Sequence, residues 1–239
     1  MLLLLAILPD ASAFRISAHR AITHGAIAAE GMEELEHWLW QGNRAEDTHL
    51  NVKWRHFSHY FRPDAALALP RRGTSDERVV VLVAEAQAAQ AAGDTAEMWR
   101  AVGGILHHVQ DMASPPHVVP VAHDLRDGFE SWPVDALVAG LDLVPAVPLD
   151  PVAAHSALAW ETWESVQSDT VSGCGVVIPL SDIWRAPASE AFGTYGGIDF
   201  GDVGDCPELA SSYEGVLVNR LEAAVRSSRS VLQHYGAAP

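Results

Sequence analysis

Apolar residues recur at spacings of three and four through most of this 239-residue chain. That spacing places them on one face of an α-helix, whereas a half-buried strand alternates apolar and polar residues. Several of the segments begin with a helix-capping aspartate, such as Asp94 or Asp150. We therefore expect an all-α fold with almost no strands. The predicted helices span residues 17–30, 31–40, 75–92, 95–112, 123–140, 151–168 and 208–235.

Size and composition favour a single multi-helix domain. Apolar residues make up 49% of the chain and supply a core, and the 19% of charged residues argues against a disordered or coiled-coil protein. No apolar run reaches the roughly 18 residues that a membrane-spanning helix needs, so we expect no transmembrane segment. Residues 173–205 are rich in glycine and lack helical spacing, and we expect them to be irregular.

The first 13 residues, MLLLLAILPDASA, are similar to a short secretory signal peptide. A brief apolar run ends at Pro9, and Ala11 to Ala13 fit the A-x-A cleavage pattern. Because no positive charge precedes the run, we expect a truncated signal. Cleavage after Ala13 would make Phe14 the first residue of a mature domain spanning 14–239, which would be secreted or periplasmic.

The two cysteines, Cys174 and Cys206, both lie in or next to the glycine-rich stretch. An even number of cysteines in an exported chain favours one disulfide. Neither cysteine belongs to a C-x-x-C pattern, so we expect the bond to be structural and not to hold a metal.

Charge and histidine content are both unusual. The chain has 15 basic and 31 acidic residues, for a net charge of −16, and 12 histidines. Ten of the histidines precede residue 124. An acidic surface repels nucleic-acid phosphates unless positive charge or bound metal is concentrated locally. We therefore expect no stable nucleic-acid partner.

The most informative segment reads LHHVQDMASPPHVVPVAHDLRDGFESW, from Leu106 to Trp132. His107 and Asp111 are four residues apart and share one face of a helix, and His117 follows the proline turn that ends it. Imidazole nitrogen combined with carboxylate oxygen, without thiolate, favours catalytic zinc. His108 points about 100° away from His107 and is interpreted as a bystander.

A second half of the same segment adds further candidates. Asp127 and Glu130 follow His123 at distances of four and seven residues. On one helix, all three side chains would form a single stripe. Upstream candidates are His19, the Glu46-Asp47 pair, and His56 and His59 in WRHFSHYFRPD.

These motifs resemble the bacterial zinc-dependent phospholipase C family, which shares its fold with fungal single-strand-specific nucleases. The segment LHHVQDMASPPH is similar to the family's core of His, Asp, Pro and His, and SHYFRPD resembles its His-aromatic-x-x-Pro segment. The ASA-F junction also fits, because family members bind metal with a processed N-terminus. The likeness covers about residues 14–132.

The resemblance implies a cluster of three zinc ions at the bottom of a cleft. The first would be held by Asp47, His59, His107 and Asp111. The second would be held by His117, His123 and a carboxylate. The third would be held by the main chain of Phe14, where the family typically has Trp, and by His19 and a bridging Asp111. Two carboxylates are candidates beside His123: the four-residue spacing favours Asp127, and the surrounding GFESW sequence favours Glu130. His56 is the alternative to His59, and Glu46 is the alternative to Asp47.

The implied activity is that of an exported zinc-dependent phosphodiester hydrolase. A phospholipase C would release diacylglycerol and a phosphorylated head group, and it would contact the membrane surface only transiently. Asp47 is the candidate that orients or deprotonates the attacking water. The alternatives are a single-strand nuclease or nucleotidase on the same metals, and a non-catalytic, zinc-stabilised binding protein.

Overall fold

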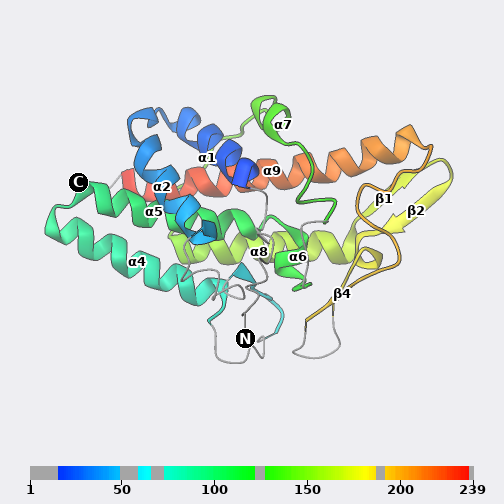
Figure 1. Cartoon of the computed structure of the whole chain (residues 1–239), viewed down its shortest axis with the longest axis horizontal. Coiled ribbons are helices and arrows are strands. Elements are labelled where there is room, and N and C mark those ends of the chain that lie inside the picture. Colours follow the sequence, from blue (N-terminus) through cyan, green and yellow to red (C-terminus); the bar gives the residue numbers. More distant parts are fainter. Residues whose placement is uncertain (1–15, 49–58, 66–72, 122–126, 187–191, 237–239) are drawn as a thin grey trace, which may run out of the picture.

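The computed structural model of the chain describes residues 16–48, 59–65, 73–121, 127–186 and 192–236, and these form a mostly helical fold (Figure 1). The helices are α1 (Ile16–Glu30), α2 (Glu36–Thr48), α4 (Ser75–Ala92), α5 (Thr95–Asp111), α6 (Pro115–Val118), α7 (Asp135–Ala139), α8 (Pro151–Ser168) and α9 (Pro207–Gly236). The strands are β1 (Thr170–Gly173), β2 (Val176–Pro179), β3 (Trp184–Arg185) and β4 (Thr194–Tyr195). Two short 3-10 turns, Glu33–Leu35 and Leu180–Asp182, complete the elements. Among the described residues, no helix is long and apolar enough to cross a membrane.

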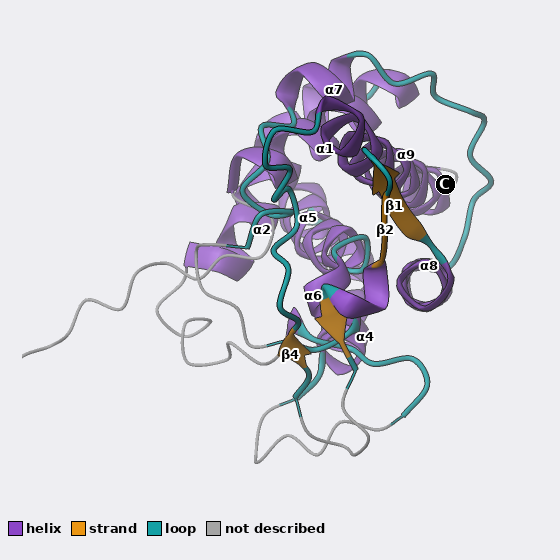
Figure 2. Cartoon of the chain, turned by 90° about the vertical axis from the view of Figure 1, so that its right-hand side faces the viewer, coloured by secondary structure: helices purple, strands orange, loops and turns teal. Residues whose placement is uncertain are grey.

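Helix α5 lies at the centre of the fold and contacts α1, α2, α4, α8 and α9. Seen from one end of the molecule, these helices lie around it, and α9 runs beside both α1 and α8 (Figure 2). Every residue of α5 from Ala101 to Asp111 is buried. This stretch includes four polar residues that are fully buried, and buried polar side chains need partners to offset their lost hydration. The partners come from the surrounding helices and form the site described below.

Two glycines let α2 and α5 touch backbone to backbone. A Cβ atom at Gly42 would overlap the carbonyl oxygen of Arg100, and one at Gly103 would overlap that of Leu39. The predicted helix at 31–40 is wrong in both bounds, because α2 starts at Glu36 and continues to Thr48. The chain does not break at Gly42 because that glycine packs against α5.

The predicted helix over 123–140 is also wrong where the structure describes it. Residues 128–131 form turns, and only Asp135–Ala139 are helical. The Oδ1 atom of Asp127 accepts hydrogen bonds from the backbone N–H groups of Phe129 and Glu130, at 2.9 and 3.1 Å. This local bonding replaces the helical pattern, and Pro133 cannot supply a backbone donor to continue it. The remaining predicted helices agree with the structure to within one or two residues.

The glycine-rich stretch is more ordered than expected. β1, which ends where the stretch begins, pairs antiparallel with β2 inside it, and the short antiparallel pair β3–β4 follows. A disulfide joins Cys174, in the β1–β2 turn, to Cys206, just before α9, with the Cα atoms 6.0 Å apart. The predicted disulfide is therefore confirmed. It fixes the hairpin against the start of the last helix.

Candidate metal centre

Five side chains from four separated parts of the chain meet beside α5. They form the histidine–aspartate cluster, which consists of His19 (α1), Asp47 (α2), His59, and His107 and Asp111 (both α5). One ligand atom each from His59, His107 and Asp111 lies within 4.8 Å of the other two, and the same holds for His19, Asp47 and His107. His107 belongs to both groups, so the cluster is continuous.

The shortest contacts in the cluster lie around His59. Its Nδ1 atom is 2.8 Å from Oδ2 of Asp111 and 3.1 Å from Nε2 of His107. The same Nε2 of His107 is 3.5 Å from Oδ2 of Asp111 and 3.7 Å from Oδ1 of Asp47. His107 and Asp111 face the same way because they are one helical turn apart, as the sequence predicted.

The buried carboxylates demand compensating positive charge. Burial opposes ionisation of Asp111, but the surrounding histidines outweigh it and hold its pKa well below the usual value. Burial also lowers the pKa of His59, but the hydrogen bond and charge of Asp111 raise it overall, to about 9. Burial raises the pKa of Asp47 to about 6. The cluster thus favours positive charge at its centre, which either a proton or a cation supplies.

The donor set fits a metal such as zinc. Imidazole and carboxylate are its common ligands in catalytic sites, and no thiolate is close by. Within the described residues, Oδ1 of Asp111 is buried and has no hydrogen-bond partner, although Nε2 of His19 lies 3.3 Å away. A buried acceptor without a donor is costly unless a cation or a water satisfies it. The burial and chemistry of this oxygen therefore fit a metal-ligand position.

A second group of donors lies beside the cluster. Nε2 of His117 is 3.0 Å from Oε1 of Glu130, and both side chains are buried. Nδ1 of His117 lies 2.8 Å from the backbone carbonyl oxygen of His59, so this nitrogen carries the proton and Nε2 faces Glu130. The hydroxyl of Ser114 donates to the same Oε1 atom at 2.9 Å. Tyr60 stacks on the His117 ring, with the centroids 5.0 Å apart.

Asp127 occupies a different environment from Glu130. Besides the two backbone bonds described above, its Oδ2 atom accepts from the hydroxyl of Tyr195 at 2.6 Å and from Nε1 of Trp184 at 3.3 Å. Four donors therefore converge on this one carboxylate. Glu130 is the carboxylate that lies against His117, with Oε1 3.0 Å from Nε2 of that ring.

Glu46 is held by structural partners. Its two oxygens accept from Nε and Nη2 of Arg78, at 3.0 and 2.7 Å, and Oε2 also lies 3.1 Å from Nε2 of His108. Burial opposes ionisation, but His108 and Arg78 lower the pKa of Glu46 well below its usual range. Asp47, with its side chain 6% exposed, is the member of the pair that faces the cluster.

His108 is part of a buried chain of contacts and not a surface residue. Its Nδ1 atom lies 3.2 Å from the hydroxyl of Ser75, which is 2.9 Å from Nε2 of His155. His108 lies outside the histidine–aspartate cluster, as expected, but it is buried and contacts both Ser75 and Glu46.

The sequence reasoning missed Gln110, which contacts His19. Its signal was the run of polar residues HHVQD at the end of an otherwise apolar helix. The predictions for residues 1–13, Phe14, His56 and His123 lie outside the described residues.

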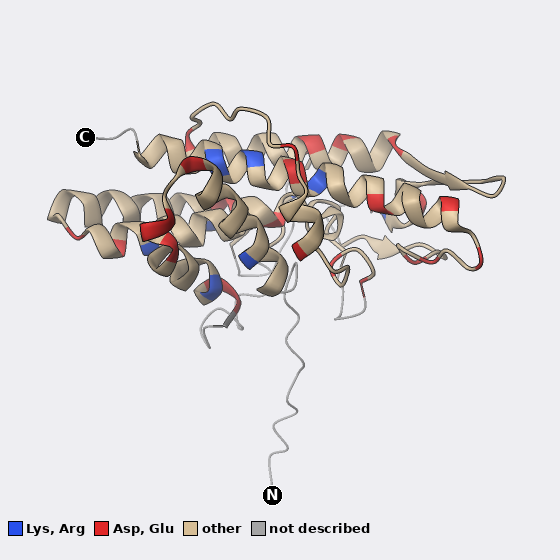
Figure 3. Cartoon of the chain, turned by 90° about the horizontal axis from the view of Figure 1, so that it is seen from above, with Lys and Arg blue, Asp and Glu red and all other residues tan. Residues whose placement is uncertain are grey.

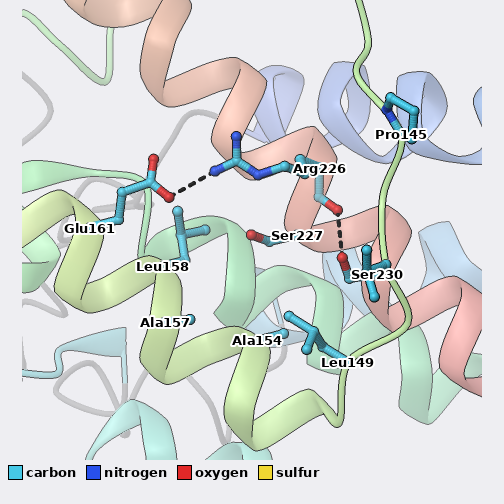
Figure 4. A pocket seen from close by; sticks show the side chains of 10 residues that line it. Pro145, Leu149, Ala154, Ala157, Leu158, Glu161, Arg226, Ser227 and Ser230 are labelled. Carbon is cyan, nitrogen blue, oxygen red and sulfur yellow. Dashed lines mark hydrogen bonds and ion pairs between the residues drawn. The ribbon is translucent and has the colours of Figure 1, made fainter.

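A pocket between α8 and α9 is separate from this centre (Figure 4). Its volume is about 200 Å³, and its walls include Leu149, Ala154 and Leu158. At its edge, Glu161 and Arg226 form an ion pair of 2.7 Å. The described residues that line it include no histidine, and its carboxylate, Glu161, is engaged by Arg226.

The sequence matches no protein-family profile, and it matches no curated protein. Among solved structures, the chain is similar to alpha-toxin of Clostridium perfringens, isolated from the avian strain SWCP. The two have 11% sequence identity and a TM-score of 0.47. The match covers 96% of this chain and 65% of the toxin chain, so this chain spans less than two thirds of the toxin's length.

Proposed function

We propose that the protein is an exported zinc-dependent phosphodiester hydrolase and, more specifically, a phospholipase C. The observation that carries this proposal is the meeting of three histidines and two aspartates from four parts of the chain in one buried cluster. Buried charges in proteins are paired or coordinate metals, and clusters of titratable side chains with shifted pKa values concentrate at functional sites. The motif resemblance described above supplies the reaction class.

The proposed ligands fall into three groups. Asp47, His59, His107 and Asp111 would hold the first zinc ion, with Asp111 bridging to the third. His117 and Glu130 would share the second with His123, and His19 would share the third with the N-terminus at Phe14. We choose Glu130 over Asp127 because Glu130 lies 3.0 Å from His117. Asp47 is chosen over Glu46 because Arg78 and His108 already engage Glu46.

When bound, zinc supplies Lewis acidity that lowers the pKa of a coordinated water and neutralises phosphate oxygens. The protein's own residues position the reactants. Oδ1 of Asp47 lies 3.7 Å from Nε2 of His107, at the proposed first zinc position, where this carboxylate would orient or deprotonate a water. Asp111 is enclosed by three histidines, and its carboxylate would be shared between the first and third zinc ions.

A phospholipid substrate fits the charge distribution better than a long nucleic acid. Acidic positions are distributed over many helices of the described fold (Figure 3), and in the whole sequence 31 acidic residues stand against 15 basic ones. Such a surface repels a polyanion along its length, whereas a single phosphodiester meets only the local charge of the site. The disulfide supports export, because such bonds persist in oxidising compartments.

The test compares metal content and activity in the same preparations. The protein would be purified with and without its first 13 residues, and zinc would be counted by elemental analysis. Diacylglycerol release from phosphatidylcholine vesicles and cleavage of single-stranded DNA would then be measured. We expect about three zinc ions, and diacylglycerol release from the form that begins at Phe14.

Two variants complete the design. Asp111→Asn should lose zinc and activity, whereas His24→Ala, which removes an exposed histidine of the same α1 helix that carries His19, should change neither. Cleavage of DNA alone would keep the site and transfer the function to the nuclease alternative. A wild-type protein that binds no metal would overturn the proposal.

A further inference from the structure

Gln110 lies next to Asp111 in the chain, and its buried side chain connects three other helices to α5. It contacts His19 and Thr23 of α1, Asn43 of α2 and Ser228 of α9. We propose that Gln110 is a positioning residue, which holds His19 in the tautomer whose Nε2 lone pair faces the histidine–aspartate cluster. This inference rests on the proposed metal site.

In the structure the amide of Gln110 has its oxygen toward Asn43 and its nitrogen toward Thr23 and Ser228. Its Oε1 atom accepts from Nδ2 of Asn43 at 3.1 Å. Its Nε2 atom donates to the hydroxyl of Thr23 at 2.9 Å and to that of Ser228 at 3.3 Å. The oxygen of the amide therefore points toward α2 and His19, and the nitrogen points toward the two hydroxyls.

This orientation decides where His19 carries its proton. Nδ1 of His19 lies 2.8 Å from Oε1 of Gln110, an atom that can only accept. A neutral ring therefore has its proton on Nδ1 and its lone pair on Nε2. That Nε2 atom is the one near Asp111 Oδ1, at 3.3 Å, and it belongs to the group with Asp47 and His107.

A histidine binds metal only through an unprotonated nitrogen, so the partner of the other nitrogen sets its readiness. With an apolar side chain at position 110, the Nδ1 proton would be buried without an acceptor. The ring would then carry its proton on Nε2 and donate it to Oδ1 of Asp111. Neither of these two atoms would then be available to bind a metal ion. Loss of such a partner typically lowers metal affinity 10- to 100-fold.

Three variants separate positioning from packing. Gln110→Met keeps the length of the side chain and removes the acceptor. Gln110→Glu keeps an acceptor for His19 and removes the amide donor. Ser228→Ala is the matched control, because it removes a hydrogen bond to the same glutamine on the side away from His19.

The first readout is the tautomer of His19, measured by ¹⁵N NMR of the ring nitrogens in the metal-free protein at a pH where the ring is neutral. We expect the Nδ1–H form in the wild type and in Gln110→Glu, and the Nε2–H form in Gln110→Met. An Nε2–H ring in the wild type would overturn the inference by itself. The wild-type measurement therefore remains decisive even if Gln110→Met does not fold.

The second readout is zinc affinity, measured by competition with a chromophoric chelator. Gln110→Met should bind the weakest-held zinc 10- to 100-fold less tightly, whereas Gln110→Glu and Ser228→Ala should stay within about threefold of the wild type. Equal affinity in folded Gln110→Met overturns the inference. A wild type that shows the Nδ1–H ring but binds no zinc would defeat the proposed function instead, so the two failures are distinguishable.

Discussion

The backbone carbonyl oxygen of His59 accepts a hydrogen bond from Nδ1 of His117 at 2.8 Å, while the ring of His59 lies 2.8 Å from Asp111. His59 thus contributes to both groups of proposed metal-binding side chains. Its ring belongs to the histidine–aspartate cluster, and its main-chain carbonyl orients His117. Because a side-chain substitution leaves the carbonyl in place, the two contributions can be separated by experiment.

Replacing His59 by alanine should remove about one zinc ion per chain and leave the ion held with His117. The ring nitrogen is lost, but the carbonyl that orients His117 is retained. Elemental analysis against the wild type checks this, with His117→Ala as the comparison. Loss of all zinc from His59→Ala would show that the groups bind only together, contrary to this prediction.

The carboxylates of Asp127 and Glu130 should have opposite effects when neutralised. Glu130→Gln should lower zinc content, because it removes the charge beside His117, with little loss of stability. Asp127→Asn should keep the zinc and lower the free energy of unfolding by about 2–3 kcal/mol, because hydrogen bonds from Tyr195 and Trp184 lose their charged acceptor. Zinc analysis and thermal melts on both variants measure the two effects, and a reversed pattern would restore Asp127 as the ligand.

Neutralising Glu46 should destabilise the fold by about 3 kcal/mol, because Arg78 would lose its buried partner. Glu85 is the natural control, since it lies 3.6 Å from the same guanidinium but its side chain is 54% exposed. Glu85→Gln should therefore cost less than about 1 kcal/mol. Urea unfolding of both variants gives the comparison, and equal losses would contradict the assignment.

The stability of the protein should fall with acid partly because of His155. Burial, and then the charge of His108, lower the pKa of His155 to about 3. An unfolded chain takes up this proton below about pH 6.5 while the folded chain does not, so stability is present above that pH and is lost as the pH falls toward 3. The slope from this group approaches about 1.4 kcal/mol per pH unit.

His155→Gln keeps a polar partner for Ser75 and cannot take up the proton. Its free energy of unfolding should depend less steeply on pH between 6 and 4 than that of the wild type. His24→Gln, which changes an exposed side chain, should follow the wild-type curve. Parallel curves for wild type and His155→Gln would show that another group carries the acid sensitivity.

The contact between α2 and α5 should tolerate no side chain at its glycines. Gly103→Ala forces a Cβ against the carbonyl oxygen of Leu39, and we expect a loss of at least about 2 kcal/mol. Gly215→Ala in α9 meets nothing within 4 Å, so it should gain about 0.5–1 kcal/mol from helix propensity. Denaturant unfolding measures both, and a neutral Gly103→Ala would disprove the close approach.

Local patterns predicted much of this architecture. The helices at 75–92 and 151–168 agree with the structure residue for residue, because capping residues mark their starts and their apolar spacing is regular. The shared face of His107 and Asp111 follows from the same helical geometry.

The errors arose where distant contacts decide the local conformation. The spacing argument favoured Asp127 because it required a helix that runs through residue 127. In the structure, the backbone N–H groups of Phe129 and Glu130 donate to the Asp127 side chain and not to a helical carbonyl. Gln110 was missed because its partners are far away in the sequence, with Ser228 separated from it by 118 residues. The stretch HHVQD marks Gln110 as unusual for a buried helix, but it does not identify partners so distant in the sequence.

The hydrogen bond from Gln110 to Ser228 has a consequence for the order in which the site is completed during synthesis. His19 is among the first described residues to leave the ribosome, and Ser228 is among the last. The glutamine that orients His19 reaches its full set of partners only after α9 has docked against α1 and α5. A nascent chain therefore carries all the described donor residues long before it holds them in their final arrangement.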